Sequence, residues 1–250
     1  MSSVLFNVEG HVGTLTLNRP EALNSLDADM ARAWARAAKE AVSNDAVQAI
    51  VIRGEGPAFC AGGDVKAMHA MAERGEAITA LAQEINSGLR ALVESAKPVV
   101  AAAHGTTAGG GLGVLLSTDY AIVGESSQIG SLYAGVGLTP DLSVTAHLTR
   151  AVGERRALQL TLSHRLLSAH EALEWGLVAE VVADDAVAAR AQEVAGEWVE
   201  VAHAYGQAKR LIRSAPSRSF AEQLQEEAHA IGRASMTPEA EARMGAFAAR

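Results

Sequence analysis

Cysteine is nearly absent from this sequence, because Cys60 is the only one among 250 residues. No disulfide can form within the chain, and such sparse cysteine usage is typical of reducing compartments, so we expect a cytoplasmic location. Aromatic residues make up 4% of the sequence, so the core must be built mainly from Ala, Val, Leu and Ile. The 29 acidic residues outnumber the 21 basic ones. This balance lacks the basic footprint of a nucleic-acid-binding protein, so no nucleic-acid partner is expected.

Long apolar runs are also missing. The longest, Val99 to Ala103, is far shorter than the roughly 20 residues that cross a bilayer, so we expect no membrane partner. The opening stretch, "MSSVLFNVEGHVGTLTLNRP", has neither the basic start nor the apolar run of a secretion signal. Nucleophile-elbow, phosphate-loop and zinc-protease motifs do not occur. None of the eight histidines forms a helical ligand pair beside an acid, so no metal site is expected.

The segments that are present predict an α/β fold. Alternating residues predict a hairpin, and short buried strands alternate with helical patterns, which indicates parallel pairing with right-handed crossovers. From Ser143 onward the pattern is nearly all helical. The predicted strands are 4–8, 12–17, 49–54, 98–105 and 119–124, and the predicted helices are 27–42, 64–71 and 76–95.

Two glycine-rich turns follow buried strands and precede helices. They are "AIVIRGEGPAFCAGGDV" (residues 49–65) and "PVVAAAHGTTAGGGLG" (residues 98–113). At such a turn the backbone N–H groups are not yet used in helical hydrogen bonds, and a glycine lets a bound group approach the backbone closely. Two N–H groups aimed at one point would form an oxyanion hole. The alternative is that these glycines only permit close packing of strand against helix.

Four ordered motifs make the chain resemble a known family. These are "NRPEALNSL" (18–26), "FCAGGDV" (59–65), "KPVVAAAHGTTAGGGLG" (97–113) and "EALEWGLVAEVV" (171–182). In order and spacing they are similar to the enoyl-CoA hydratase/isomerase, or crotonase, superfamily over nearly the whole chain. The resemblance implies a ββα spiral core with an acyl-CoA site in residues 1–195, and a helical oligomerisation region in residues 196–250. It also implies homotrimers or hexamers, and no cofactor besides the coenzyme A that forms part of the substrate.

The resemblance also assigns roles to individual residues. The backbone N–H groups of Gly63 and Gly110 would form the oxyanion hole for the thioester oxygen. The remaining positions would contact the coenzyme A or the acyl group: Ala61 through its carbonyl to the adenine, Asp64 and Val65 beside the ligand, and Ala22 and Leu23 along the coenzyme A.

The chain departs from the pattern of the hydratases in this superfamily. The two glutamates that hold and activate water fall on Gly113 and Tyr133, so efficient hydration is not expected. One acid remains nearby, Asp141, where similar isomerases of ring-opened phenylacetate carry "PD". Its alternative role is to cap the helix that begins near Ser143. Tyr133 would either fill the acyl pocket or donate a hydrogen bond to Asp141.

We therefore predict an enzyme that shifts a double bond of an acyl-CoA from the 3- to the 2-position, with Asp141 as acid and base. Dehalogenation is disfavoured because the histidine of similar dehalogenases falls on Asn86. The alternatives are a hydratase or other lyase of low activity, and a homologue that binds acyl-CoA without catalysis.

Overall fold

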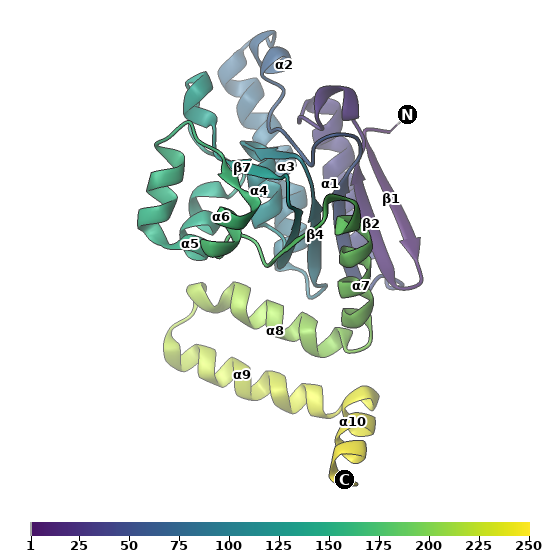
Figure 1. The fold of residues 1–250 in the computed structure, drawn as a ribbon. Helices are drawn as coiled ribbons and strands as arrows, with labels where there is room; N and C mark the ends of the chain where they lie inside the picture. Colours follow the sequence, from purple (N-terminus) through teal and green to yellow (C-terminus); the bar gives the residue numbers. More distant parts are fainter. Residues whose placement is uncertain (1) are drawn as a thin grey trace.

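The computed structural model describes residues 2–250, and a six-stranded sheet lies at its centre (Figure 1). The strand order is β1-β2-β3-β4-β6-β9; β1 and β2 pair antiparallel, and the remaining neighbours pair parallel. The strands are β1 (Val4–Glu9), β2 (Val12–Leu17), β3 (Ala49–Gly54), β4 (Val99–Ala103), β6 (Tyr120–Gly124) and β9 (Glu180–Val182). The expected hairpin, its parallel neighbours and the α/β class are confirmed.

The two faces of this sheet are covered by different helices. Ile50 and Ile52 point to the face covered by α1 (Ala28–Ser43) and α3 (Arg74–Glu94), whereas Val51 points to the face covered by α7 (Val187–Val199). This follows from the alternation of side chains along a strand, which places successive residues on opposite faces. The predicted cap of α1 is confirmed, because the Asp27 side chain accepts a hydrogen bond of 2.8 Å from the Met30 amide.

A second, three-stranded sheet lies beside the first one. It joins β5 (Thr106–Ala108), β7 (Gln128–Gly130) and β8 (Leu167–Ser168) in the order β5-β7-β8. These short strands, and β9 of the first sheet, were not predicted, since runs of two or three residues carry no measurable periodicity. The helix α4 (Gly110–Leu116) starts at the second glycine-rich turn, directly after β5.

The last third of the chain is mainly helical, as predicted. After α5 (Val144–Thr161) and α6 (Ala169–Glu174), three helices extend below the core in Figure 1: α8 (Ala202–Ser214), α9 (Phe220–Ser235) and α10 (Pro238–Ala248). The predicted boundary after residue 195 falls inside α7. No helix within residues 2–250 is both long and apolar enough to cross a membrane.

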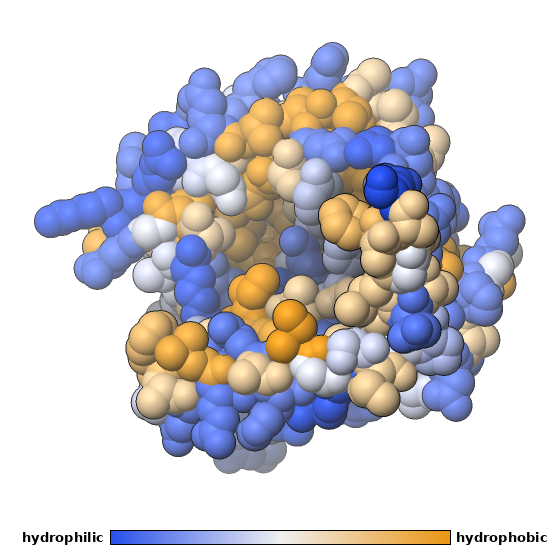
Figure 2. Space-filling view, turned by 90° about the horizontal axis from the view of Figure 1, so that it is seen from below, coloured by the Kyte–Doolittle hydropathy of each residue, from blue (hydrophilic) through white to orange (hydrophobic). Residues whose placement is uncertain are grey.

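Apolar side chains are exposed on the helices below the core. Phe220 and Ile231 of α9 are 79% and 73% exposed, and Phe247 of α10 is 78% exposed. Figure 2, which views this side of the molecule, shows apolar residues gathered along its edge and around a hollow. Exposure of several large apolar side chains on one face is typical of a surface that contacts another protein.

Candidate active site

Both glycine-rich turns face one cavity of about 700 Å³. Gly63 and Gly110 line it from the two turns, and Tyr133 and Asp141 line it from the segment between β7 and α5. The rest of the wall is mainly apolar and comes largely from α3 and from residues 132–142. A concave, mostly apolar pocket with a few converging polar groups is typical of a small-molecule site.

The amides of Gly63 and Gly110 are both free of internal hydrogen bonds. On either side of Gly63, the Leu26 amide donates to Gly62 O at 2.7 Å and the Asp64 amide donates to Leu26 O at 3.0 Å, but Gly63 N–H donates to no acceptor in residues 2–250. Gly110 is the first residue of α4, so its N–H has no partner within the helix, and none elsewhere in that range. Two unpaired amides therefore line the same cavity.

Glycine is required to bring the two turns this close together. Gly62 has φ of +106°, in the region that favours glycine. A Cβ on Gly62 would lie 2.9 Å from Ala108 O and 3.2 Å from Gly110 N. The N-cap of α4, Gly109, has φ of +51° and ψ of −124°. The backbone of the first turn thus touches the start of α4, which explains glycines at a point where helix propensity alone would disfavour them.

Asp141 and Tyr133 form a hydrogen-bonded pair in the cavity. The Tyr133 hydroxyl donates to Asp141 Oδ1 at 2.6 Å. Burial raises the pKa of the Asp141 carboxyl above its ordinary value, although the hydrogen bond from Tyr133 lowers it. Burial, with the charge of Asp141, raises the pKa of Tyr133 far above its ordinary range, so Tyr133 remains a donor. The pair offers one carboxylate that is held in place and partly removed from water.

The Asp141 side chain is turned toward the cavity and away from α5. Its main-chain carbonyl accepts from the Val144 amide at 3.0 Å, while its carboxylate accepts from Tyr133. Ser143 occupies the N-cap position of α5, and no side-chain capping bond is formed there. The next two residues, Leu142 and Ser143, have φ of +48° and +68°. Such values in non-glycine residues cost free energy, which is tolerated most often at functional sites.

The position of the first missing hydratase glutamate is closed by packing. A Cβ on Gly113 would lie 2.3 Å from the main-chain oxygen of Leu142. No side chain fits there unless the segment that carries Asp141 moves away. The absence of this glutamate and the present placement of Asp141 are therefore linked.

The other expected ligand contacts are divided between the cavity and its surroundings. Ala61 and Val65 line the cavity, and Leu23 lies beside Ala61, whose amide donates to Leu23 O at 3.0 Å. Ala22 and Asp64 are outside the lining. Asp64 caps α2 (Val65–His69). It accepts from the Ala67 amide at 3.0 Å and from the Arg19 guanidinium at 2.8 Å, and these bonds lower its pKa despite some burial.

Comparison with known proteins decides the family. The enoyl-CoA hydratase/isomerase family matches residues 7–249. The chain belongs to this family. It is 34% identical over 233 residues to the 1,2-epoxyphenylacetyl-CoA isomerase of Escherichia coli (strain K12), covering 90% of this chain and 87% of that protein.

Solved structures of enoyl-CoA hydratase/isomerase family members have the same fold, which confirms the expected crotonase-like architecture. The enoyl-CoA hydratase from Bacillus anthracis has a TM-score of 0.92 at 27% identity, with 98% of this chain and 95% of that chain covered. A Thermobifida fusca protein in complex with CoA has a TM-score of 0.84 at 28% identity, covering 100% and 95%.

The sequence did not indicate one wall of the cavity. Ile78, Leu81 and Ile85 of α3 line it together with Leu138 and His164. The i, i+3, i+7 spacing of these residues on α3 predicts an apolar face, but it does not distinguish a face against the core from one against a pocket. His164 is 23 positions after Asp141 in the chain, and no local pattern indicates that both border one cavity.

Proposed function

We propose that this protein is an acyl-CoA isomerase that moves a double bond from the 3- to the 2-position. The observation that carries the proposal is the combination of two unpaired amides and a single acid around one apolar cavity. Asp141 is the only acidic residue within 2–250 that lines this cavity. The reaction needs one acid–base group and a stabilised enolate, and it needs no second carboxylate to activate water.

The proposed mechanism uses Asp141 twice. Its carboxylate removes a proton from the carbon next to the thioester carbonyl, and the electrons move onto the carbonyl oxygen. The amides of Gly63 and Gly110 donate hydrogen bonds to that enolate oxygen. The protonated Asp141 then returns the proton to the γ carbon, the double bond becomes conjugated, and the carboxylate is regenerated. No proton or electron is gained or lost overall.

Tyr133 is proposed to position the acid. Its hydroxyl lies 2.6 Å from one carboxylate oxygen, so the other oxygen of Asp141 is left to face the substrate. The donated hydrogen bond also stabilises the ionised form, which acts as the base. Its ring fills part of the cavity wall and limits the space for the acyl group.

The coenzyme A is proposed to lie outside the cavity mouth, past Ala61. It would be bordered by Ala22, Leu23, Asp64 and Val65. The Asp64 side chain is held in place by its hydrogen bonds to Ala67 and Arg19.

No cofactor is proposed beyond the coenzyme A of the substrate. The exposed apolar faces of α9 and α10 are proposed to assemble the chain into trimers or hexamers, which light scattering of the purified protein tests directly. The proposed location is the cytoplasm.

The experiment that tests the proposal follows isomerisation of a 3-enoyl-CoA by the absorbance of its conjugated product. Asp141→Asn keeps the shape of the side chain and removes the base, so we expect kcat to fall by about 10²- to 10⁴-fold. Asp185→Asn is the matched control, since Asp185 is exposed on η3 (Asp184–Ala186). Equal rates for wild type and Asp141→Asn would remove Asp141 from the mechanism. Ordinary rates of water addition to crotonyl-CoA would favour a hydratase instead, and tight acyl-CoA binding without turnover would favour a binding protein.

A further inference from the structure

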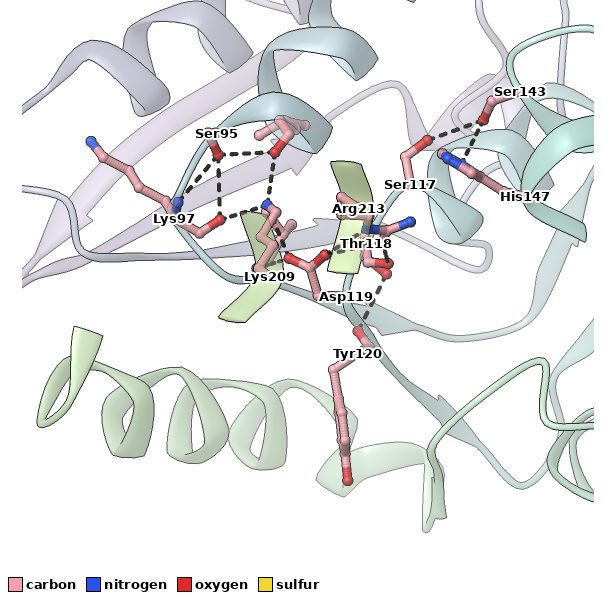
Figure 3. Close-up of polar contacts among 12 residues, drawn as sticks. Ser95, Lys97, Ser117, Thr118, Asp119, Tyr120, Ser143, His147, Lys209 and Arg213 are labelled. Carbon is pink, nitrogen blue, oxygen red and sulfur yellow. Dashed lines mark hydrogen bonds and ion pairs between the residues drawn. The ribbon is translucent and has the colours of Figure 1, made fainter. Parts of the chain in front are cut away.

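A second cavity, here called the rear cavity, has a volume of about 360 Å³ and lies where α4, β6, α5 and α8 meet; it shares no lining residue with the first cavity. One acidic and three basic side chains line it: Asp119, His147, Arg150 and Arg213. Figure 3 shows three of them, with Arg213 between the Asp119 ion pairs and the group formed by Ser117, Ser143 and His147. No function proposed above uses these residues.

The negative charge in this cavity is already neutralised. Asp119 pairs with Lys209 Nζ at 3.0 Å and with Arg213 at 3.0 Å, and one of its oxygens also accepts from the Val99 amide at 2.9 Å. Lys209 is 7% exposed and donates to Leu92 O and Lys97 O as well. One carboxylate thus pairs with two cations, and Arg150 adds a third positive charge to the cavity lining.

Two guanidinium groups have donors that remain unused. Arg213 directs Nε and Nη2 at Asp119 and the Thr118 carbonyl, while its Nη1 donates to no acceptor in residues 2–250. Arg150 pairs with no acidic side chain in the same range. Guanidinium groups form strong, directed hydrogen bonds with oxyanions, and a site with surplus positive charge favours such a ligand.

The pKa of His147 is lowered by burial and by the positive charge of the same two arginines. Its Nδ1 lies 3.1 Å from the Ser143 hydroxyl oxygen. Burial and the charges of Arg213 and Arg150 lower its pKa to about 4, whereas Asp119 raises it. The ring is therefore neutral at neutral pH. An anion bound between the guanidinium groups would offset their charge and bring the pKa of His147 back toward its ordinary value.

We propose that this rear cavity binds a phosphate-type oxyanion, held by Arg150 and Arg213 with His147 beside them. The two arginines line the cavity from different helices, α5 and α8, and the surplus charge suits an ion with about two negative charges. The volume accommodates a phosphoryl group with a few water molecules. The bond from His147 to Ser143, two residues after Asp141, places this ion next to the segment that holds the catalytic acid.

Calorimetric titration with inorganic phosphate at constant ionic strength tests the proposal, and it needs no turnover, so its outcome is separate from that of the isomerase assay. Wild type is expected to bind phosphate saturably. Arg150→Gln removes one charged donor and should weaken binding by about tenfold or more. Arg155→Gln is the matched control, because Arg155 is exposed on the same helix and does not line the cavity. Its affinity should equal that of wild type.

Proton uptake is the second readout. At about pH 5.5 the bound anion should raise the protonation of His147, so wild type should take up more protons on binding than His147→Gln does. The two proteins should therefore differ in how strongly the binding enthalpy depends on the buffer's ionisation enthalpy, because any proton exchange by the phosphate itself is common to both. Tighter binding of a phosphate monoester than of inorganic phosphate would identify the ligand as part of a larger molecule. Absence of saturable binding, or equal weakening by both arginine variants, would overturn the proposal. A changed oligomeric state of Arg150→Gln without phosphate binding would overturn it too, by assigning Arg150 to an ion pair between copies.

Discussion

Replacement of Gly110 by proline removes one N–H donor of the proposed oxyanion hole and puts a ring methylene in place of the amide hydrogen. Gly110 is the first residue of α4, a position where the N–H has no partner in the helix and where proline is favoured. Gly109, the residue before it, lies outside the α region, as a residue before proline should. The helix is therefore expected to form in Gly110→Pro.

The alanine variant of the same residue serves as the control. A Cβ at position 110 would lie 2.8 Å from Leu142 Cδ1 and 3.3 Å from Leu26 Cδ1, both ends of flexible side chains. Gly110→Ala and Gly110→Pro share this crowding, but only the alanine variant keeps the N–H. The ratio of their kcat values therefore reports the loss of the N–H donor together with the ring methylene that replaces its hydrogen.

Loss of one oxyanion donor costs about 10²- to 10³-fold in kcat, or about 2.7–4 kcal/mol. We expect this difference between the alanine and proline variants in the 3-enoyl-CoA assay, with similar melting temperatures by circular dichroism. Equal kcat values for two equally folded variants would refute the assignment of Gly110 as a donor.

Three further predictions concern the surroundings of the site. Tyr133→Phe removes a bond that lowers the pKa of Asp141, so the pH at which kcat/KM rises to its plateau should shift upward; an unchanged pH profile would contradict the pairing. Gly113→Ala should lower the free energy of unfolding in urea by about 1–3 kcal/mol, because its Cβ would lie 2.3 Å from the main-chain oxygen of Leu142. Wild-type stability of this variant would show that the segment around Leu142 can move aside without a cost in free energy. Asp119→Ala leaves Lys209 buried without its carboxylate and should cost about 3–5 kcal/mol, measured in the same way; a loss below about 1 kcal/mol would contradict the importance of the pair.

The pKa shift of Asp141 also has a consequence for stability. Its pKa in the folded state is raised, so folding favours the protonated form, and that contribution is lost as the pH rises through the folded pKa. Asp141→Asn should therefore have a higher Tm than wild type at neutral pH. The difference in Tm should shrink when the pH falls below the pKa that Asp141 has in the unfolded chain. A lower Tm at neutral pH would contradict the effect assigned to burial.

Much of the main sheet was predictable because most of its strands have five or six residues, enough to show either an alternating pattern or a continuous apolar run. The run at residues 49–54 is bounded by turn residues and buried on both faces, and it forms β3 as expected. The Asp27 cap of α1 is a local signal that the structure confirms. By contrast, β5, β7, β8 and β9 have two or three residues each, and their pairing depends on contacts distant in the chain.

Only the part of the candidate site that forms a local sequence pattern, the glycine-rich turns, could be predicted from the residues themselves. The second glycine-rich turn stands out because glycines at a helix start require a reason, but Gly63, Gly110 and Asp141 were singled out by the resemblance. The bond from Tyr133 to Asp141 depends on how residues 132–143 turn, including positive φ at Leu132 and Leu142. Neither residue is of a type that signals such a conformation. The rear cavity combines Asp119, His147 and Arg213 from three separate parts of the chain, which no sequence pattern brings together.

The most direct test of the account is a crystal structure with a 3-enoyl-CoA analogue bound. The account predicts the thioester oxygen about 2.7–3.1 Å from the backbone nitrogens of both Gly63 and Gly110. It also predicts an Asp141 carboxylate oxygen within reach of both the α and the γ carbon of the acyl group. A thioester oxygen bonded elsewhere, or a carboxylate out of reach of both carbons in every subunit, would contradict it.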